Sequence, residues 1–269
     1  MALPLPTTLS PSKVSSFKDC GLAFRLSAID RLPEPPSPPA TKGTLVHRAL
    51  ELLFCAPPER RTMTDALACL DRARDEMQLD TEFIDLGLDA AAEAEFAADA
   101  ESLLRNYFRL ENPAAINPIG LELMMEARVG TLRLRGVIDR LELDADGGLV
   151  ITDYKTGSVP GVAYEQGRLG GVHFYAFLCE QVLGVRPAKI QLLYLSEPVA
   201  IIAQPSDQSI RGLRQRALAI WSAVERACEQ EDFRPRPSRL CDWCAFHAYC
   251  PAFGGKPPSS PAELTASLA

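Results

Sequence analysis

The spacing of hydrophobic residues predicts helices for most of the first 111 residues of the chain. Residues 10–29 open with Ser and Pro and continue with an apolar period of about 3.6, which is typical of a capped helix. Five prolines within residues 31–40 predict a stiff, extended connector. The apolar side of residues 41–54 predicts a second helix, and the Ala-rich residues 62–111 predict two or three more.

The hydrophobic pattern changes after residue 118, where short runs of alternating and β-branched residues predict strands. Residues 121–129, 131–143 and 148–156 are expected to form three consecutive strands, with Asp144–Gly148 as a hairpin turn. The rest of the chain predicts a helix over 171–183, strands over 189–196 and 200–204, and a long helix over 207–231. This order of elements predicts an α/β fold.

Composition sets the scale of the molecule. The 269 residues, 47% of them hydrophobic, suffice for one large domain or two small ones with an ample core, and we expect a single domain over residues 1–269. No apolar run reaches about 18 residues, and the N-terminus lacks the basic and apolar regions of a secretory signal. A cytoplasmic protein without a membrane segment is therefore expected.

The net charge of −7 belongs to one segment. Residues 61–111 contain thirteen acidic residues and five arginines, so the remainder of the chain carries a net charge of about +1. We expect this segment to be an acidic helical insertion that packs at the periphery, because it would repel phosphates. The overall acidity leaves room for a basic groove elsewhere.

Two acids and a lysine on neighbouring predicted strands suggest hydrolytic chemistry. Asp139 lies in GVIDRLEL, and Asp153 and Lys155 lie in ITDYKTG on the next strand. Two carboxylates on adjacent strands can share one Mg²⁺ or Mn²⁺ and leave positions for water and a phosphate oxygen. Lys155 shares a strand face with Asp153 and can orient the attacking water. His47, in GTLVHRALE on a predicted helix, can add a nitrogen ligand.

Each of these residues also has a plain structural interpretation. Most Asp-x-Lys triplets are solvated strand surface, and Asp139 could pair with Arg135 or Arg140. The order of helix histidine, strand acid and D-Y-K-T-G strand favours the catalytic interpretation.

This arrangement resembles the RecB-type exonuclease branch of the PD-(D/E)XK nuclease superfamily. The motifs GTLVHRALE, GVIDRLEL and ITDYKTG carry the resemblance, which extends from about residue 10 to residue 250. It implies a restriction-endonuclease-like central mixed β-sheet flanked by helices and a metal-dependent deoxyribonuclease. It also implies a DNA substrate that is single-stranded or has frayed ends. A role in repair or recombination and a helicase or repair partner are expected with it.

The resemblance also assigns roles to individual residues. His47, Asp139 and Asp153 match the family's metal ligands, the carbonyl of Tyr154 completes the metal shell, and Lys155 matches the catalytic lysine. Asp139 and Asp153 count among the catalytic residues as well. The acids that precede them, Glu122 and Glu126, are candidates to approach the metal through water or to be solvent-facing strand charges.

One departure from the family pattern concerns the helix after the Asp-x-Lys strand. Tyr175 matches the tyrosine of a Gln-x-x-x-Tyr motif and is a catalytic candidate, but Gly171 stands where the family has glutamine. Gln166 and His173 are nearby polar residues, and neither is in helical register with Tyr175. The departure weakens the case for DNA positioning and leaves the metal ligands intact.

A dense group of cysteines lies near the C-terminus, within the cluster segment 232–250. Cys241, Cys244 and Cys250 need a fourth ligand for a closed site, and Cys20 is the natural candidate. Four thiolates suit tetrahedral Zn²⁺ or a [4Fe–4S] cluster, and His247 could close a zinc site within the tail alone. The remaining cysteines are expected to be buried apolar side chains: Cys55, Cys69, Cys179 and Cys228.

The distribution of one N-terminal and three C-terminal cysteines resembles the iron–sulfur nucleases of the RecB branch, including the AddB type. That resemblance implies a [4Fe–4S] cluster on Cys20, Cys241, Cys244 and Cys250, an iron–sulfur staple that joins the two ends of the chain. Residues 251–269 are expected to form a flexible tail. Arginines are frequent before the cluster and suit phosphate contacts. Aromatic residues nearby could stack on bases or shield the cluster: Trp243, Phe246 and Tyr249.

Two other functions fit parts of this pattern. A cluster-bearing DNA-binding or assembly module with an idle nuclease site would fit Gly171, although the complete set of acids and lysine argues against it. A zinc-ribbon protein unrelated to nucleases would leave the D-Y-K-T-G strand unexplained. The chain has no G-x-x-x-x-G-K-[ST] sequence, so no ATP-driven motor is expected in it.

Overall fold

The computed structural model describes residues 2–257, apart from the side chains of residues 162–170 and 172. The chain divides into two compact units, each built from segments that are distant in sequence. Unit 1 comprises Met1–Pro35, Glu126–Arg135 and Arg211–Ala269, and unit 2 comprises Pro36–Met125 and Gly136–Ile210. The single nuclease domain expected over residues 1–269 stays a prediction.

A five-stranded mixed sheet has the strand order β1-β2-β3-β4-β5. Strand β3 pairs antiparallel with β2 and parallel with β4, and β4 pairs antiparallel with β5. The strands are β1 (Pro118–Val129), β2 (Leu132–Leu143), β3 (Leu149–Lys155), β4 (Lys189–Tyr194) and β5 (Val199–Ala203). All five strands were expected, and the sheet with its flanking helices confirms the predicted α/β fold.

The connections between the strands follow from the residues in the turn after β2 and from the parallel pairing of β3 with β4. In the predicted hairpin turn, the Asp144 carboxylate accepts hydrogen bonds from the N–H groups of Asp146 and Gly148, and Gly147 takes the positive φ that the turn requires. The parallel connection from β3 to β4 runs through helix α7 (Val162–Leu183), because parallel strands cannot be joined by a tight turn.

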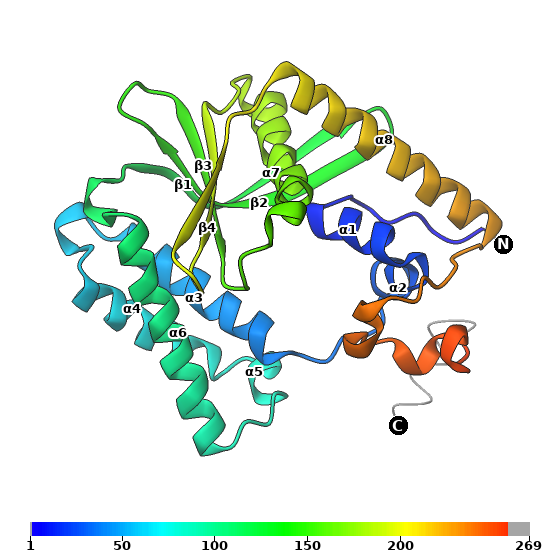
Figure 1. The fold of residues 1–269 in the computed structure, drawn as a ribbon, viewed down its shortest axis with the longest axis horizontal. Helices are drawn as coiled ribbons and strands as arrows, with labels where there is room; N and C mark the ends of the chain where they lie inside the picture. Colours follow the sequence, from blue (N-terminus) through cyan, green and yellow to red (C-terminus); the bar gives the residue numbers. More distant parts are fainter. Residues whose placement is uncertain (1, 258–269) are drawn as a thin grey trace. The chain divides into compact units, whose positions relative to one another are not determined.

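Three helices, labelled in Figure 1, supply most of the main hydrophobic core of unit 2, together with residues of β3 and β4. They are α3 (Pro38–Cys55), α4 (Met63–Met77) and α6 (Ala90–Leu110), and the short α5 (Thr81–Ile84) joins the last two. Their buried leucines, alanines and aromatic residues meet Tyr154 and Leu193 of the sheet. The acidic segment therefore forms three helices, in line with the prediction.

Two expected boundaries in the N-terminal region are wrong. The connector ends early, because Pro38 and Pro39 open α3, where the missing N–H groups would have no helical partner. The single helix over residues 10–29 is broken at Cys20, whose backbone is extended with φ −157° and ψ 114°. The resulting pieces are α1 (Pro11–Asp19), α2 (Gly21–Phe24) and the π-helical turn η1 (Arg25–Ile29).

Unit 1 brings the two ends of the chain together. The N–H of Leu3 donates to the carbonyl of Cys228, and that of Leu22 donates to the carbonyl of Arg234. Phe24 packs against Val224 and Phe233 in a buried cluster with Cys228. The long helix α8 (Asp207–Gln230) enters this unit and is followed by short 3₁₀ turns: η4 (Arg239–Trp243), η5 (His247–Tyr249) and η6 (Pro251–Phe253). The predicted tail begins with η6, and residues 258–269 lie outside the described part.

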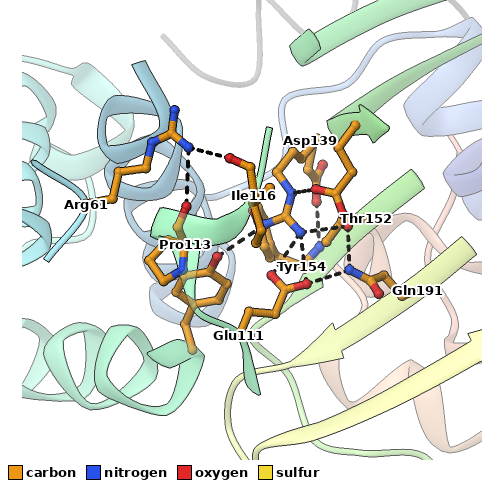
Figure 2. Close-up of polar contacts among 11 residues, drawn as sticks. Arg61, Glu111, Pro113, Ile116, Asp139, Thr152, Tyr154 and Gln191 are labelled. Carbon is orange, nitrogen blue, oxygen red and sulfur yellow. Dashed lines mark hydrogen bonds and ion pairs between the residues drawn. The ribbon is translucent and has the colours of Figure 1, made fainter. Parts of the chain in front are cut away.

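Arg61 holds together the two ends of the acidic segment. Its buried guanidinium donates to the carbonyls of Phe54 and Ala56 on one side and of Pro113 and Ile116 on the other, two of which Figure 2 draws. Two 3₁₀ turns flank these carbonyls, η2 (Pro58–Arg60) and η3 (Pro113–Ala115). The residues just before and just after the helical segment are thus held by one side chain, and its description as an insertion stays a prediction. None of the described helices is long and apolar enough to span a bilayer.

Candidate metal centre

Three side chains of unit 2 bring possible metal ligands together. Ligand atoms of His47 on α3, Glu122 on β1 and Asp139 on β2 all lie within 4.8 Å of one another. The Nδ1 atom of His47 lies 3.6 Å from the Asp139 carboxylate and 3.9 Å from that of Glu122. His47 and Asp139 were predicted ligands, and Glu122 was one of two candidate acids.

The register of β2 and β3 explains how the two predicted acids come close. Arg140 pairs with Thr152 across the two strands, and Asp139 and Asp153 each lie one residue beyond this pair. The Asp139 carboxylate accepts a hydrogen bond of 2.7 Å from the backbone N–H of Tyr154. The acid is thereby fixed to the strand that carries Asp153.

His47 is fixed to the same strand. Its Nε2 lies 3.2 Å from the backbone carbonyl oxygen of Tyr154, which accepts a hydrogen bond from it. Two neighbouring ligands of one octahedral ion, each at about 2.1 Å, also lie about 3 Å apart. The distance therefore suits both the hydrogen bond and joint coordination of a metal. The carbonyl ligand role of Tyr154 stays a prediction.

Asp153 and Lys155 share a face of β3, as predicted from strand alternation. The Lys155 ammonium lies 2.5 Å from the Asp153 carboxylate, and Asp153 is buried while Lys155 is partly exposed. Asp153 is not a member of the group formed by His47, Glu122 and Asp139, and its role as a metal ligand stays a prediction. The lysine places a positive charge directly beside the buried Asp153.

Burial and neighbouring negative charges shift the pKa values of the acids in this site. Burial, together with the nearby Asp139, raises the pKa of Glu122 to about 7. Burial and the nearby Asp153 raise the pKa of Asp139 as well, and burial lowers that of His47, which favours the neutral imidazole. Carboxylate oxygens with one neutral imidazole suit a hard divalent cation such as Mg²⁺ or Mn²⁺, which would relieve the repulsion. The donor set fits the expected metal.

Glu122 has a backbone feature that the sequence pattern does not reveal. Its φ is +42°, in the left-handed region that non-glycine residues rarely adopt, although it lies inside β1. Such a conformation costs about 1–3 kcal/mol and persists where the surroundings hold it in place. The irregular strand brings its carboxylate to His47. Glu126, the other candidate, pairs instead with Arg133 at 2.6 Å.

The ring of Tyr175 lies directly against β2, the strand that carries Asp139. A Cβ atom on Gly136 would lie 2.9 Å from the Tyr175 ring, so only glycine admits the ring here. Burial and the charges of Asp153 and Asp139 raise the pKa of Tyr175, which places its hydroxyl in their field. The catalytic role of Tyr175 stays a prediction. Gly171 has open space around its Cα, and the Gln166 side chain lies outside the described part.

A cleft of about 480 Å³ leads to the group. Besides His47 and Glu122 it is lined by residues of α3: Ala40, Gly43, Thr44, Arg48 and Glu51. None of these lining residues belongs to the acidic segment, although Glu76 of that segment pairs with Arg48. Gly43 permits α3 to approach the end of β3, because a Cβ there would lie 3.0 Å from the Thr156 hydroxyl.

The four predicted cluster cysteines gather in unit 1. Cys20, Cys241, Cys244 and Cys250 all line one cavity of about 260 Å³. Three of them pack with the buried Leu22, Leu26 and Phe246. Of the other cysteines, Cys179 and Cys228 are buried as expected. Cys69 is half-buried, and Cys55 is exposed because it ends α3.

Backbone N–H groups point at two of these sulfurs. The N–H of Arg236 donates to the Cys20 sulfur at 3.4 Å, and that of Ser238 donates to the Cys241 sulfur at 3.3 Å. Such bonds favour thiolates, which are the forms that bind metals. The ring of His247 stacks on Phe253 beside the same cavity.

Comparisons with known proteins identify the superfamily of the chain. The model of the PD-(D/E)XK nuclease superfamily matches residues 8–251, and the chain belongs to that superfamily. The Gene 69 protein of Mycobacterium phage L5 is 27% identical over 136 residues, which is 49% of this chain and 44% of that protein. The chain thus aligns with less than half of that relative's length.

A solved structure from Eubacterium rectale, described as a candidate exonuclease, shares the fold. It has 14% sequence identity and a TM-score of 0.61, with 97% of this chain and 93% of that chain covered. At this identity the likeness establishes the fold alone.

The contrast between Glu122 and Glu126 gives a matched test of the site. Glu122→Gln should weaken Mn²⁺ binding about tenfold or more, because it removes a ligand oxygen charge beside His47. Glu126→Gln, on the same strand but paired with Arg133, should bind Mn²⁺ like the parent. Isothermal titration calorimetry with Mn²⁺ measures both. Equal affinities for the two variants would remove Glu122 from the metal centre.

Proposed function

We propose that the protein is a RecB-type exonuclease that uses Mg²⁺ or Mn²⁺ to hydrolyse phosphodiester bonds in DNA. The observation that carries this proposal is the group of His47, Glu122 and Asp139 beside the Asp153–Lys155 ion pair. Membership of the nuclease superfamily supports it independently. Single-stranded or end-frayed DNA is the proposed substrate, in repair or recombination.

The residues of this centre divide the chemistry between them. His47, Asp139, Asp153 and the Tyr154 carbonyl would hold the metal, together with Glu122. The ion supplies Lewis-acid activation of a phosphate oxygen and of the attacking water. Lys155 is partly exposed and would orient that water, and Tyr175, whose ring packs against β2 at Gly136, is proposed as a further catalytic residue.

The cysteines in unit 1 are proposed to hold a [4Fe–4S] cluster. All four cysteines line one cavity, and four thiolates suit a tetrahedral Zn²⁺ or a [4Fe–4S] cluster. The resemblance of one N-terminal and three C-terminal cysteines to the iron–sulfur nucleases favours the cluster. Cys20 comes from the break between α1 and α2, and its three partners come from the C-terminal turns. The cluster would act as a staple between the two ends of the chain.

Aromatic and basic residues near the cysteines have separate proposed roles. Phe246 is buried and packs with the cysteines, which supports shielding of a cluster. Trp243 is 81% exposed and is available to stack on an unpaired base. The arginines that precede the cysteines would contact DNA phosphates. A helicase or another repair protein is the proposed protein partner.

Substitutions on β3 test the nuclease assignment. Asp153→Ala should abolish cleavage of single-stranded DNA and weaken Mn²⁺ binding. Lys155→Ala should abolish cleavage with Mn²⁺ binding largely kept, because its side chain carries no ligand atom for a cation. Asp146→Ala, in the exposed hairpin turn, is the control and should cut at the parental rate. Parental cleavage by both β3 variants would refute the assignment. A parent protein that binds DNA without cutting it would favour the idle-site module.

The cluster is tested on protein purified without air. We expect a brown protein with about four irons and four sulfides per chain, because one cubane takes four thiolates. Cys20→Ser should lower cluster content and the melting temperature as much as Cys244→Ser does. Cys55→Ser, exposed and outside the cavity, should change neither. A colourless protein with one zinc and full tolerance of Cys20→Ser would replace the cluster with a zinc site that includes His247.

A further inference from the structure

A fully buried arginine lies directly beside the metal centre in sequence and has no part in the chemistry described above. Arg140 follows Asp139 on β2, and its side chain points to the opposite face of the strand. Arg140 therefore forms no ion pair with Asp139, although such a pair was one structural interpretation of Asp139 in the sequence. Its charge is instead met by Glu111, in two hydrogen bonds of 2.8 and 2.9 Å, and by Glu142.

Neutral groups complete the surroundings of this guanidinium. The Tyr154 hydroxyl accepts a hydrogen bond from Arg140 at 2.8 Å, the Tyr107 hydroxyl at 3.2 Å and the Thr152 hydroxyl at 3.0 Å. Gln191 of β4 joins the same network, and Figure 2 shows its bonds to Glu111 and Thr152. The guanidinium carbon also lies 4.7 Å from the centre of the Phe54 ring. A buried charge with this many partners holds them in one arrangement.

Tyr154 connects this network to the metal centre. Its hydroxyl is held by Arg140 on the core side, whereas its backbone N–H binds the Asp139 carboxylate and its carbonyl contacts His47. Its ring also packs edge-on against the rings of His47 and Tyr107. Two of the three side chains of the metal group are thus oriented by the backbone of one residue.

We propose that Arg140 is a positioning residue, which acts through the Tyr154 hydroxyl to set the places of the Asp139 carboxylate and the His47 imidazole. The inference rests on the proposed function only in that the centre binds a metal. Burying a charged arginine costs free energy that burying an apolar side chain of similar size would not cost. Alignment of the metal ligands is a function that would explain why a charged residue occupies this position. Partners that orient metal ligands typically change metal affinity by about 10–100-fold when removed.

Two tyrosine hydroxyls on the same guanidinium nitrogen provide a matched pair of variants. Tyr154→Phe and Tyr107→Phe each remove one buried hydroxyl that accepts a hydrogen bond from Nη1 of Arg140. Only Tyr154 has backbone contacts with Asp139 and His47, whereas Tyr107 lies on α6. Urea unfolding should show similar losses of stability. Mn²⁺ affinity, measured by calorimetry, should fall about tenfold in Tyr154→Phe and stay at the parental value in Tyr107→Phe.

Cleavage kinetics separate positioning from a general loss of structure. Tyr154→Phe should lower kcat at saturating DNA while KM stays within twofold, and added Mn²⁺ should restore part of the rate. Arg140→Lys keeps the charge but cannot bridge the same partners, so it should weaken Mn²⁺ binding in the same direction, and it decides the question if Tyr154→Phe does not fold. Equal Mn²⁺ affinities of the Tyr154 and Tyr107 variants, or a parental affinity in Arg140→Lys, would overturn the proposal. A parent that binds Mn²⁺ but cuts no DNA would refute the nuclease and leave the positioning role standing.

Discussion

The cost of removing carboxylates from water, together with their mutual repulsion, is the constraint on which the candidate centre depends. Asp139 and Asp153 lie one residue beyond the same strand pair, and Glu122 approaches from β1. Removal from water raises the free energy of the charged forms, as the raised pKa values of Glu122 and Asp139 indicate. The fold holds the group together by the Tyr154 backbone on one side and by a left-handed residue in β1 on the other. A divalent cation bound to these residues would offset their negative charge.

Much of this centre could be predicted from the sequence, because its residues follow short-range rules. Strand alternation places Asp153 and Lys155 on one face, and consecutive strands joined by a short turn bring Asp139 beside them. The choice of Glu122 over Glu126 could not be predicted. It depends on a positive φ within a strand, for which the sequence offers no glycine or asparagine as a signal. The hydrogen-bond network of Arg140 could not be predicted from the sequence either, because Glu111 and Gln191 come from elements far from Arg140 in the chain.

The fold shows the same division between local and long-range information. The five strands and most helices appear where expected, whereas the errors lie at helix boundaries. Helix α7, for example, begins at Val162 and not at residue 171. Prolines begin α3 because the first helical turn tolerates a missing N–H, and Cys20 is extended where the pattern predicts a continuous helix. That break directs Cys20 into the cavity lined by the three C-terminal cysteines, so the local deviation coincides with the proposed ligand role.

The central claim is that His47, Glu122 and Asp139 form one metal centre in this nuclease-superfamily protein. Anomalous X-ray scattering from crystals soaked in Mn²⁺ tests it most directly, because the signal locates the ion without reference to activity. The account predicts one strong manganese peak bonded to the His47 imidazole and to the carboxylates of Glu122 and Asp139. Manganese bound only at exposed carboxylates elsewhere, with these three side chains left without an ion, would contradict it.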